Sequence, residues 1–184
     1  RLDARLAGAD AHRLRQLDND HLAVADLAGA RHVADRLARD LRRLCEWQIR
    51  FFGTPAPMDR YVFLVTAVGE GYGGLEHRAS TALLCSRDDL PRPGVKAATE
   101  SYRTFLGLAS HEYFHAWNVK RLRPVELGPF NYEEEVLTRS LWVAEGVTDY
   151  YADLALHRAG LSTREELLDA IFAQDPYGRV ACES

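Results

Sequence analysis

The sequence predicts an α+β fold that combines a small N-terminal sheet with a mainly helical C-terminal part. Segments rich in β-branched and aromatic residues occur in the first half of the chain, and stretches with apolar residues at helical spacing dominate the second half. Strands and helices that are segregated in this way, rather than alternating, are typical of a sheet packed against helices. We expect residues 1–96 to contain the sheet and one long helix, and residues 97–184 to be helical.

The N-terminal elements follow from local patterns. Apolar residues recur at helical spacing over residues 30–52, and Gly53 ends the predicted helix. Residues 60–67, with the sequence RYVFLVTA, predict a buried strand. A loop with glycines at 69–74 follows, and residues 75–85 form a second extended segment.

The C-terminal half contains three predicted helices, over residues 97–119, 135–159 and 162–173. The last of these begins with Ser162 and Glu165, which have the spacing of a capping box. Near the N-terminus, residues 18–20 (Asp-Asn-Asp) predict a turn.

Composition limits the classes of partner. Hydrophobic residues make up 47% of the 184 residues, charged residues 27%, and the net charge is -4. A chain of this composition can bury a core, and it lacks the basic excess that nucleic acids or anionic membranes require. No apolar run approaches the roughly 18 residues of a membrane span. We therefore expect neither nucleic acid nor membrane as a partner.

The cysteines and the first residue bear on location and completeness. Cys45, Cys85 and Cys182 are widely spaced and odd in number, so we expect free thiols and favour a reducing, cytoplasmic location. The chain begins with Arg1 and its only methionine is Met58, which indicates a fragment of a longer protein.

The strongest chemical signal is the segment from His111 to His115, with Glu112 between the two histidines. On a helix, residues four apart lie on one face, so both imidazoles can reach one small cation. Zinc accepts neutral histidine nitrogens in tetrahedral geometry, and the intervening glutamate can act as a base toward zinc-bound water. A pair of exposed histidines on a helix turn is the alternative, which the apolar surroundings make less favourable.

A catalytic zinc site needs a third protein ligand, for which Glu134 and Glu145 compete. Glu134 lies in an acidic run beside a predicted loop, where solvation is its expected role. Glu145 is flanked by apolar and aromatic residues, including Trp142 and Tyr150, which we expect in the core. A carboxylate in such a setting requires a partner, so we choose Glu145.

Asp149 follows Glu145 by four residues and lies on the same helix face. We expect it to accept the outer N–H of a ligating histidine and to fix that ring's orientation. An exposed acidic pair is the alternative.

Three blocks of this sequence closely resemble the glycyl aminopeptidase family of zinc metallopeptidases. They are HEYFHAWNVKRLRP at 111–124, LWVAEGVTDYY at 141–151 and YGGLEHRAST at 72–81, and they occur in the family's order. The resemblance implies a thermolysin-like metallopeptidase fold for a catalytic-domain fragment. It also implies one Zn²⁺ held by His111, His115 and Glu145, with Glu112 as catalytic base.

The resemblance further implies a peptide substrate with a free N-terminus, release of N-terminal glycine or alanine, and a PDZ domain elsewhere in the full-length protein. Gly73 and Gly74 let the backbone approach a ligand, and an edge strand there can pair with an extended peptide. Similarity to related aminopeptidases implies that Glu76 grips the substrate's α-amino group.

Two other functions stay open, a peptide-binding module without catalysis and an endopeptidase of the same fold. Glu76 argues against the endopeptidase, because an amine-binding carboxylate would block a continuing chain. Related aminopeptidases place a transition-state tyrosine well beyond the third zinc ligand, and this chain ends at Ser184. We therefore expect the isolated fragment to be inactive.

Overall fold

The computed structural model describes residues 14–16, 22–25, 31–129, 131 and 133–173. The turn predicted at 18–20 and Cys182 lie outside these residues. The elements in chain order are β1 Leu14–Gln16, β2 Leu22–Ala25, α1 Arg31–Phe52, β3 Tyr61–Val68, β4 Gly73–Glu76, β5 Ser80–Ser86, η1 Arg87–Asp89, α2 Glu100–Phe114, η2 Val125–Leu127, α3 Leu141–Ala144, α4 Gly146–Arg158 and α5 Arg164–Ala173.

The described strands form one five-stranded sheet in the order β1-β2-β3-β5-β4. Strands β2, β3 and β5 are mutually parallel, whereas β4 runs antiparallel to β5. Strand β4 is therefore the edge strand on one side, as the glycine-rich segment predicts. The sheet and the helical remainder confirm the predicted α+β fold. The division of the chain at residue 96 stays a prediction.

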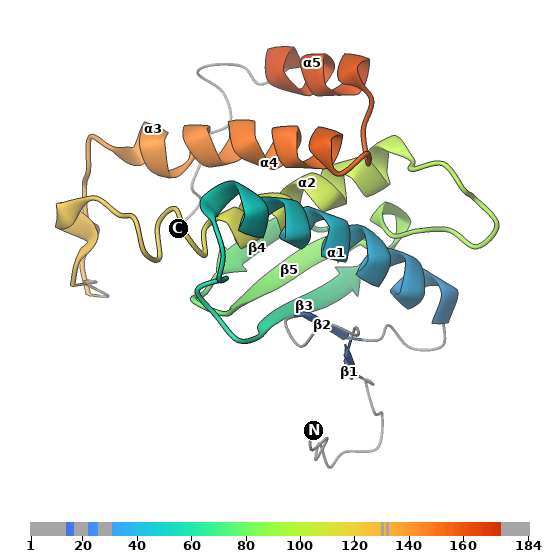
Figure 1. The fold of residues 1–184 in the computed structure, drawn as a ribbon, viewed down its shortest axis with the longest axis horizontal. Helices are drawn as coiled ribbons and strands as arrows, with labels where there is room; N and C mark the ends of the chain where they lie inside the picture. The colour runs from blue at the N-terminus through green and yellow to red at the C-terminus, as the bar shows by residue number, and fades with distance from the viewer. Residues whose placement is uncertain (1–13, 17–21, 26–30, 130, 132, 174–184) are drawn as a thin grey trace.

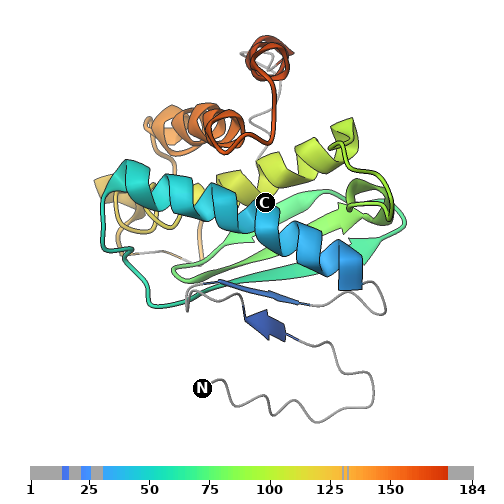
Figure 2. The same ribbon diagram turned by 45° about the vertical axis from the view of Figure 1, so that its right-hand side comes forward.

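The helices gather on one face of the sheet. Helices α1 and α2 lie across this face, and α4 packs on the side of α2 that faces away from the sheet, with α5 beyond it (Figures 1 and 2). Burial on β3 alternates accordingly, because Tyr61 and Phe63 are fully buried while Leu64 is 49% exposed. Among the described residues, no helix covers the opposite face.

The core lies between the sheet and helices α1, α2 and α4. The side chains of Leu37, Leu41 and Leu44 on α1 are at most 1% exposed, and their helical spacing is the pattern that predicts this helix. Cys45 and Cys85 are both buried free thiols, as expected. No described helix is both long and apolar enough to cross a membrane.

Two predicted helices are longer than the observed ones. Helix α2 begins after Thr99, whose side chain accepts a hydrogen bond from the Tyr102 N–H, and ends at Phe114 rather than residue 119. It ends because the Asn118 side chain donates to the Val143 carbonyl and holds the chain in turns against α3. The predicted start of the next helix at residue 135 is also wrong, because that helical segment begins only at Leu141.

The helix predicted over 135–159 is also interrupted at Glu145, which separates α3 from α4. The carbonyl of Ala144 accepts hydrogen bonds from the side chains of Thr148 and Asn118, and these compete with regular helix bonding. The capping box of α5 is one residue later than predicted. Thr163 and Glu166 form it through reciprocal bonds of 2.8 and 3.1 Å, so Ser162 precedes the cap.

Candidate metal centre

Two histidines at the end of α2 form the centre of the candidate site. His111 lies in the last turn of α2, and His115 is its C-cap residue. Their Nε2 atoms are 2.9 Å apart, with ring planes nearly perpendicular at 88°. The side chains are 18% and 4% exposed, so both imidazoles are largely withdrawn from water. The helical spacing thus produces the convergence expected from the sequence.

The third member of the group comes from the junction of α3 and α4. Oε2 of Glu145 lies 3.2 Å from Nε2 of His111 and 3.5 Å from Nε2 of His115. These three residues form a group that can hold a metal ion, as judged over the described part of the chain. The rival Glu134 is exposed in the preceding loop and does not belong to this group.

The apolar environment that the sequence predicts for Glu145 is partly wrong. Trp142 is 69% exposed and Tyr150 is 46% exposed, so neither belongs to the core. Trp142 lies in the short helix α3, where it projects from the molecule rather than into it. What brings Glu145 to the histidines is the packing of α4 on α2, together with the helix break at Glu145 itself.

Both histidines have an acceptor at their outer ring nitrogen. Nδ1 of His111 lies 2.7 Å from Oδ1 of Asp149, the contact predicted for Asp149. Nδ1 of His115 lies 2.7 Å from the backbone carbonyl of Asn118, a contact that sequence reasoning missed. If each Nδ1–H donates to its acceptor, a cation that replaces the proton at Nε2 would meet the Nε2 lone pairs of both rings at the common point.

The donor set fits a tetrahedral cation. Ligand atoms about 2.0–2.2 Å from a zinc ion in tetrahedral directions lie about 3.3–3.5 Å from one another. The observed separations of 2.9, 3.2 and 3.5 Å agree with that within about half an ångström. Two imidazoles and one carboxylate, with one direction left over, are the ligand pattern of catalytic zinc sites. The roles of the individual ligands stay predictions.

The carboxylates around the histidines stabilise positive charge. Burial alone lowers the pKa of His111, but hydrogen bonds to Asp149 and Glu145 outweigh it and raise that pKa to about 10. Burial likewise raises the pKa of Glu145, but its bonds to the histidines bring that pKa to about 2. The site therefore favours a positive charge, which a divalent cation provides as well as a proton does.

Glu112 lies beside this group but outside it. Its side chain is 5% exposed, and its Oε2 has no hydrogen-bond partner among the described residues. Burial raises the pKa of Glu112 to about 7, against a lowering effect from His111 and His115. A buried carboxylate with an unused oxygen and a pKa near neutrality suits proton transfer at physiological pH.

Strand β4 forms the neighbouring wall of the site. A Cβ atom added to Gly74 would lie 2.5 Å from Cγ of Glu112 and closer still to its carboxylate, whereas one added to Gly73 would meet nothing within 4 Å. Glu76, at the end of β4, forms an ion pair with Lys120, with Oε1 2.8 Å from Nζ. Sequence reasoning expected Gly73, Gly74 and Glu76 to meet substrate. It did not foresee the contacts with Glu112 and Lys120.

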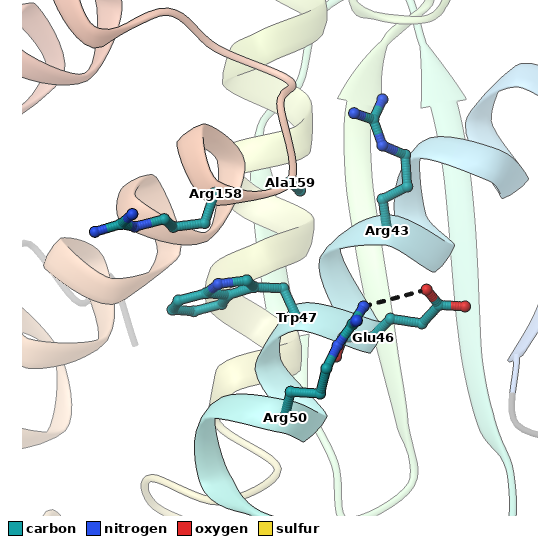
Figure 3. A pocket seen from close by; sticks show the side chains of 6 residues that line it. All are labelled: Arg43, Glu46, Trp47, Arg50, Arg158 and Ala159. Carbon is teal, nitrogen blue, oxygen red and sulfur yellow. Dashed lines mark hydrogen bonds and ion pairs between the residues drawn. The ribbon is translucent and has the colours of Figure 1, made fainter.

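A separate pocket lies between α1 and α4 and shares no residue with this site (Figure 3). The guanidinium groups of Arg43, Arg50 and Arg158 point in different directions there, and Arg50 pairs with Glu46 (Figure 3). These cations do not converge on a common ligand.

Comparisons with known proteins relate this fold and its His-His-Glu group to a family of peptidases. Residues 104–175 match the family model of the M61 glycyl aminopeptidases. The chain belongs to this glycyl aminopeptidase family, as the three sequence blocks predict.

A solved structure supports the same assignment. The chain is similar to the crystal structure of an aminopeptidase N family protein from Idiomarina loihiensis, with 43% sequence identity and a TM-score of 0.73. The match covers 80% of this chain and 25% of that protein, so this chain spans about a quarter of its relative. A search of curated proteins found no match.

Proposed function

We propose that this chain is the catalytic core of a zinc-dependent aminopeptidase that releases N-terminal residues, preferably glycine or alanine, from peptides. The observation that carries the proposal is the convergence of His111, His115 and Glu145 beside the buried, unpaired carboxylate oxygen of Glu112. A zinc ion held by the three residues would supply Lewis-acid chemistry, polarising the scissile carbonyl and making water more acidic.

Glu112 is the general base in this mechanism. Its carboxylate accepts the proton of the attacking water and then donates it to the leaving amine. Burial raises the pKa of Glu112, which makes its carboxylate a stronger acceptor for the proton of the attacking water. Contact with Gly74 on one side keeps the carboxylate beside the metal ligands.

Strand β4 is the proposed docking edge for the substrate backbone. The N–H of His77 donates to the Ser80 carbonyl, and Leu75 pairs with Ala82. Hydrogen-bonded pairs recur at every second residue of an antiparallel ladder, so the backbone groups of Gly74 and Glu76 point away from β5. An extended peptide can add there as a further strand.

Glu76 gives the reaction its preference for chain ends. A carboxylate near the open edge attracts the α-ammonium of a free N-terminus, whereas a continuing chain would bring an uncharged amide to the same place. This feature supports an aminopeptidase over an endopeptidase. A PDZ domain elsewhere in the full-length protein and a peptide with a free N-terminus are the partners that we propose.

The test combines metal analysis with cleavage of glycyl-p-nitroanilide by the longer protein. We expect one zinc per chain, cleavage of the free-amine substrate, and no cleavage of its N-acetylated form. Glu112→Gln keeps the shape of the side chain and should retain zinc while losing turnover. Zinc binding without cleavage would favour a non-catalytic peptide-binding module, and equal cleavage of both substrates would favour an endopeptidase.

A further inference from the structure

The ion pair between Glu76 and Lys120 joins the substrate edge to the end of the metal-binding helix. Nζ of Lys120 lies 2.8 Å from Oε1 of Glu76, and the two side chains are only 16% and 21% exposed. The backbone N–H of Lys120 donates to the carbonyl of His115 at 3.0 Å. Lys120 is thus fixed to the metal helix through its backbone and to β4 through its side chain.

This pairing changes what Glu76 can offer a ligand. A carboxylate has two oxygens and about four acceptor positions, and Lys120 occupies positions on Oε1. Partly buried, charge-assisted hydrogen bonds hold their geometry better than exposed ion pairs do. The remaining oxygen, Oε2, is therefore presented in a restricted orientation rather than sampling several rotamers at the end of an edge strand.

We propose that Lys120 is a positioning residue for recognition of the substrate N-terminus. It holds the Glu76 carboxylate through Oε1 and leaves Oε2 to accept the α-ammonium of the peptide. This inference rests on the proposed function, in which Glu76 binds the free amine. Lys120 acts through Glu76 and does not touch the substrate, so its contribution falls on binding of the amine and not on bond cleavage.

The alternative consequence of the same contact is competition. If Lys120 blocked the carboxylate, the substrate would have to displace the lysine, and removing the ammonium would tighten binding of free amines. Removal of the Lys120 ammonium should weaken binding of free amines if Lys120 positions Glu76, and should tighten it if Lys120 competes with the substrate. Measuring the affinity of one variant therefore distinguishes the two roles.

The experiment measures binding and turnover in parallel. In the longer protein, calorimetry gives the Kd of glycyl-alaninamide and of its N-acetylated form, and kinetics give KM and kcat for glycyl-p-nitroanilide. Lys120→Met should weaken binding of the free amine about tenfold, which corresponds to about 1.4 kcal/mol, with kcat changed less than twofold. Binding of the acetylated form should not change. Lys120→Arg should restore most of the affinity, and Lys96→Met controls for loss of an exposed lysine.

A double-mutant cycle tests whether Lys120 acts through Glu76. In a Glu76→Gln background, Lys120→Met should have no further effect on binding of the free amine. Additive losses, tighter binding by Lys120→Met, or an equal loss for both peptides would overturn the inference. If the wild type itself does not discriminate the two peptides, the proposed function fails. If it does and Lys120→Met discriminates equally well, only the role of Lys120 fails.

Discussion

Replacement of Gly74 by alanine tests how closely the edge strand and the catalytic base fit together. The added methyl group would lie 2.5 Å from Cγ of Glu112 and closer to its carboxylate. Ordinary contacts between carbon atoms are about 3.5–4.0 Å, so the Glu112 side chain must move by about 1 Å. The Glu112 side chain has little room for this movement, because the residue is only 5% exposed.

A misplacement of about 1 Å in a reacting group can cost about 100-fold in rate, so we expect Gly74→Ala to lower kcat about 100-fold. The zinc content should not change, because the three atoms nearest to the added Cβ all belong to Glu112, which is not one of the proposed zinc ligands. Gly69→Ala is the matched control, since a Cβ there meets nothing within 4 Å. The assay is cleavage of glycyl-p-nitroanilide by the longer protein, with parallel metal analysis. A Gly74→Ala protein whose kcat stays within threefold of the wild type would refute the reasoning.

Three further substitutions test the supports of the site and of the fold. Asp149→Asn leaves a weaker acceptor at Nδ1 of His111 and should weaken zinc affinity about 10- to 100-fold in a chelator competition. Unchanged zinc affinity would show that Asp149 does not support metal binding by His111. Thr163→Ala deletes the cap of α5 and should lower the free energy of unfolding by about 1 kcal/mol in urea. A neutral result would mean that this helix contributes little to global stability. Burial raises the pKa of Asp153 from 3.8 to about 6, with a smaller contribution from Asp149. The folded protein therefore binds this proton more tightly than the unfolded chain, and the stabilising effect is full below about pH 4 and is lost as the pH rises through 6. Asp153→Asn should stabilise the protein by about 3 kcal/mol at pH 8 and by nothing at pH 4. An equal effect at both pH values would rule out a titration of Asp153.

The part of the site that sequence predicts depends on local geometry. His111 and His115 share a helix face because they are four residues apart, and this spacing fixes their convergence wherever the helix packs. Asp149 meets His111 for a related reason, since it lies one turn after Glu145 on α4. The pairing of His111 with His115 and the alignment of Asp149 with Glu145 need only helical periodicity, whereas the meeting of the two pairs depends on the packing of α4 on α2.

The parts that sequence did not predict depend on tertiary contacts. Helix α2 ends where the side-chain amide of Asn118 donates hydrogen bonds to carbonyls of α3. No local sequence pattern predicts these bonds, because the two segments are far apart in the chain. The sequence predicts Trp142 in the core because tryptophan is usually well buried, but on the four-residue helix α3 this residue is 69% exposed. The contact of Gly74 with Glu112 likewise depends on the packing of the edge strand β4 against α2, which the sequence does not predict.

The proposed zinc site depends most on Glu145, rather than Glu134, as its third protein ligand. The direct measurement is the zinc content per chain of purified Glu145→Gln and Glu134→Gln proteins, determined by mass spectrometry of the metal. We predict one zinc in the wild type and in Glu134→Gln, and loss of zinc in Glu145→Gln. Full zinc content in Glu145→Gln together with loss in Glu134→Gln would contradict the account.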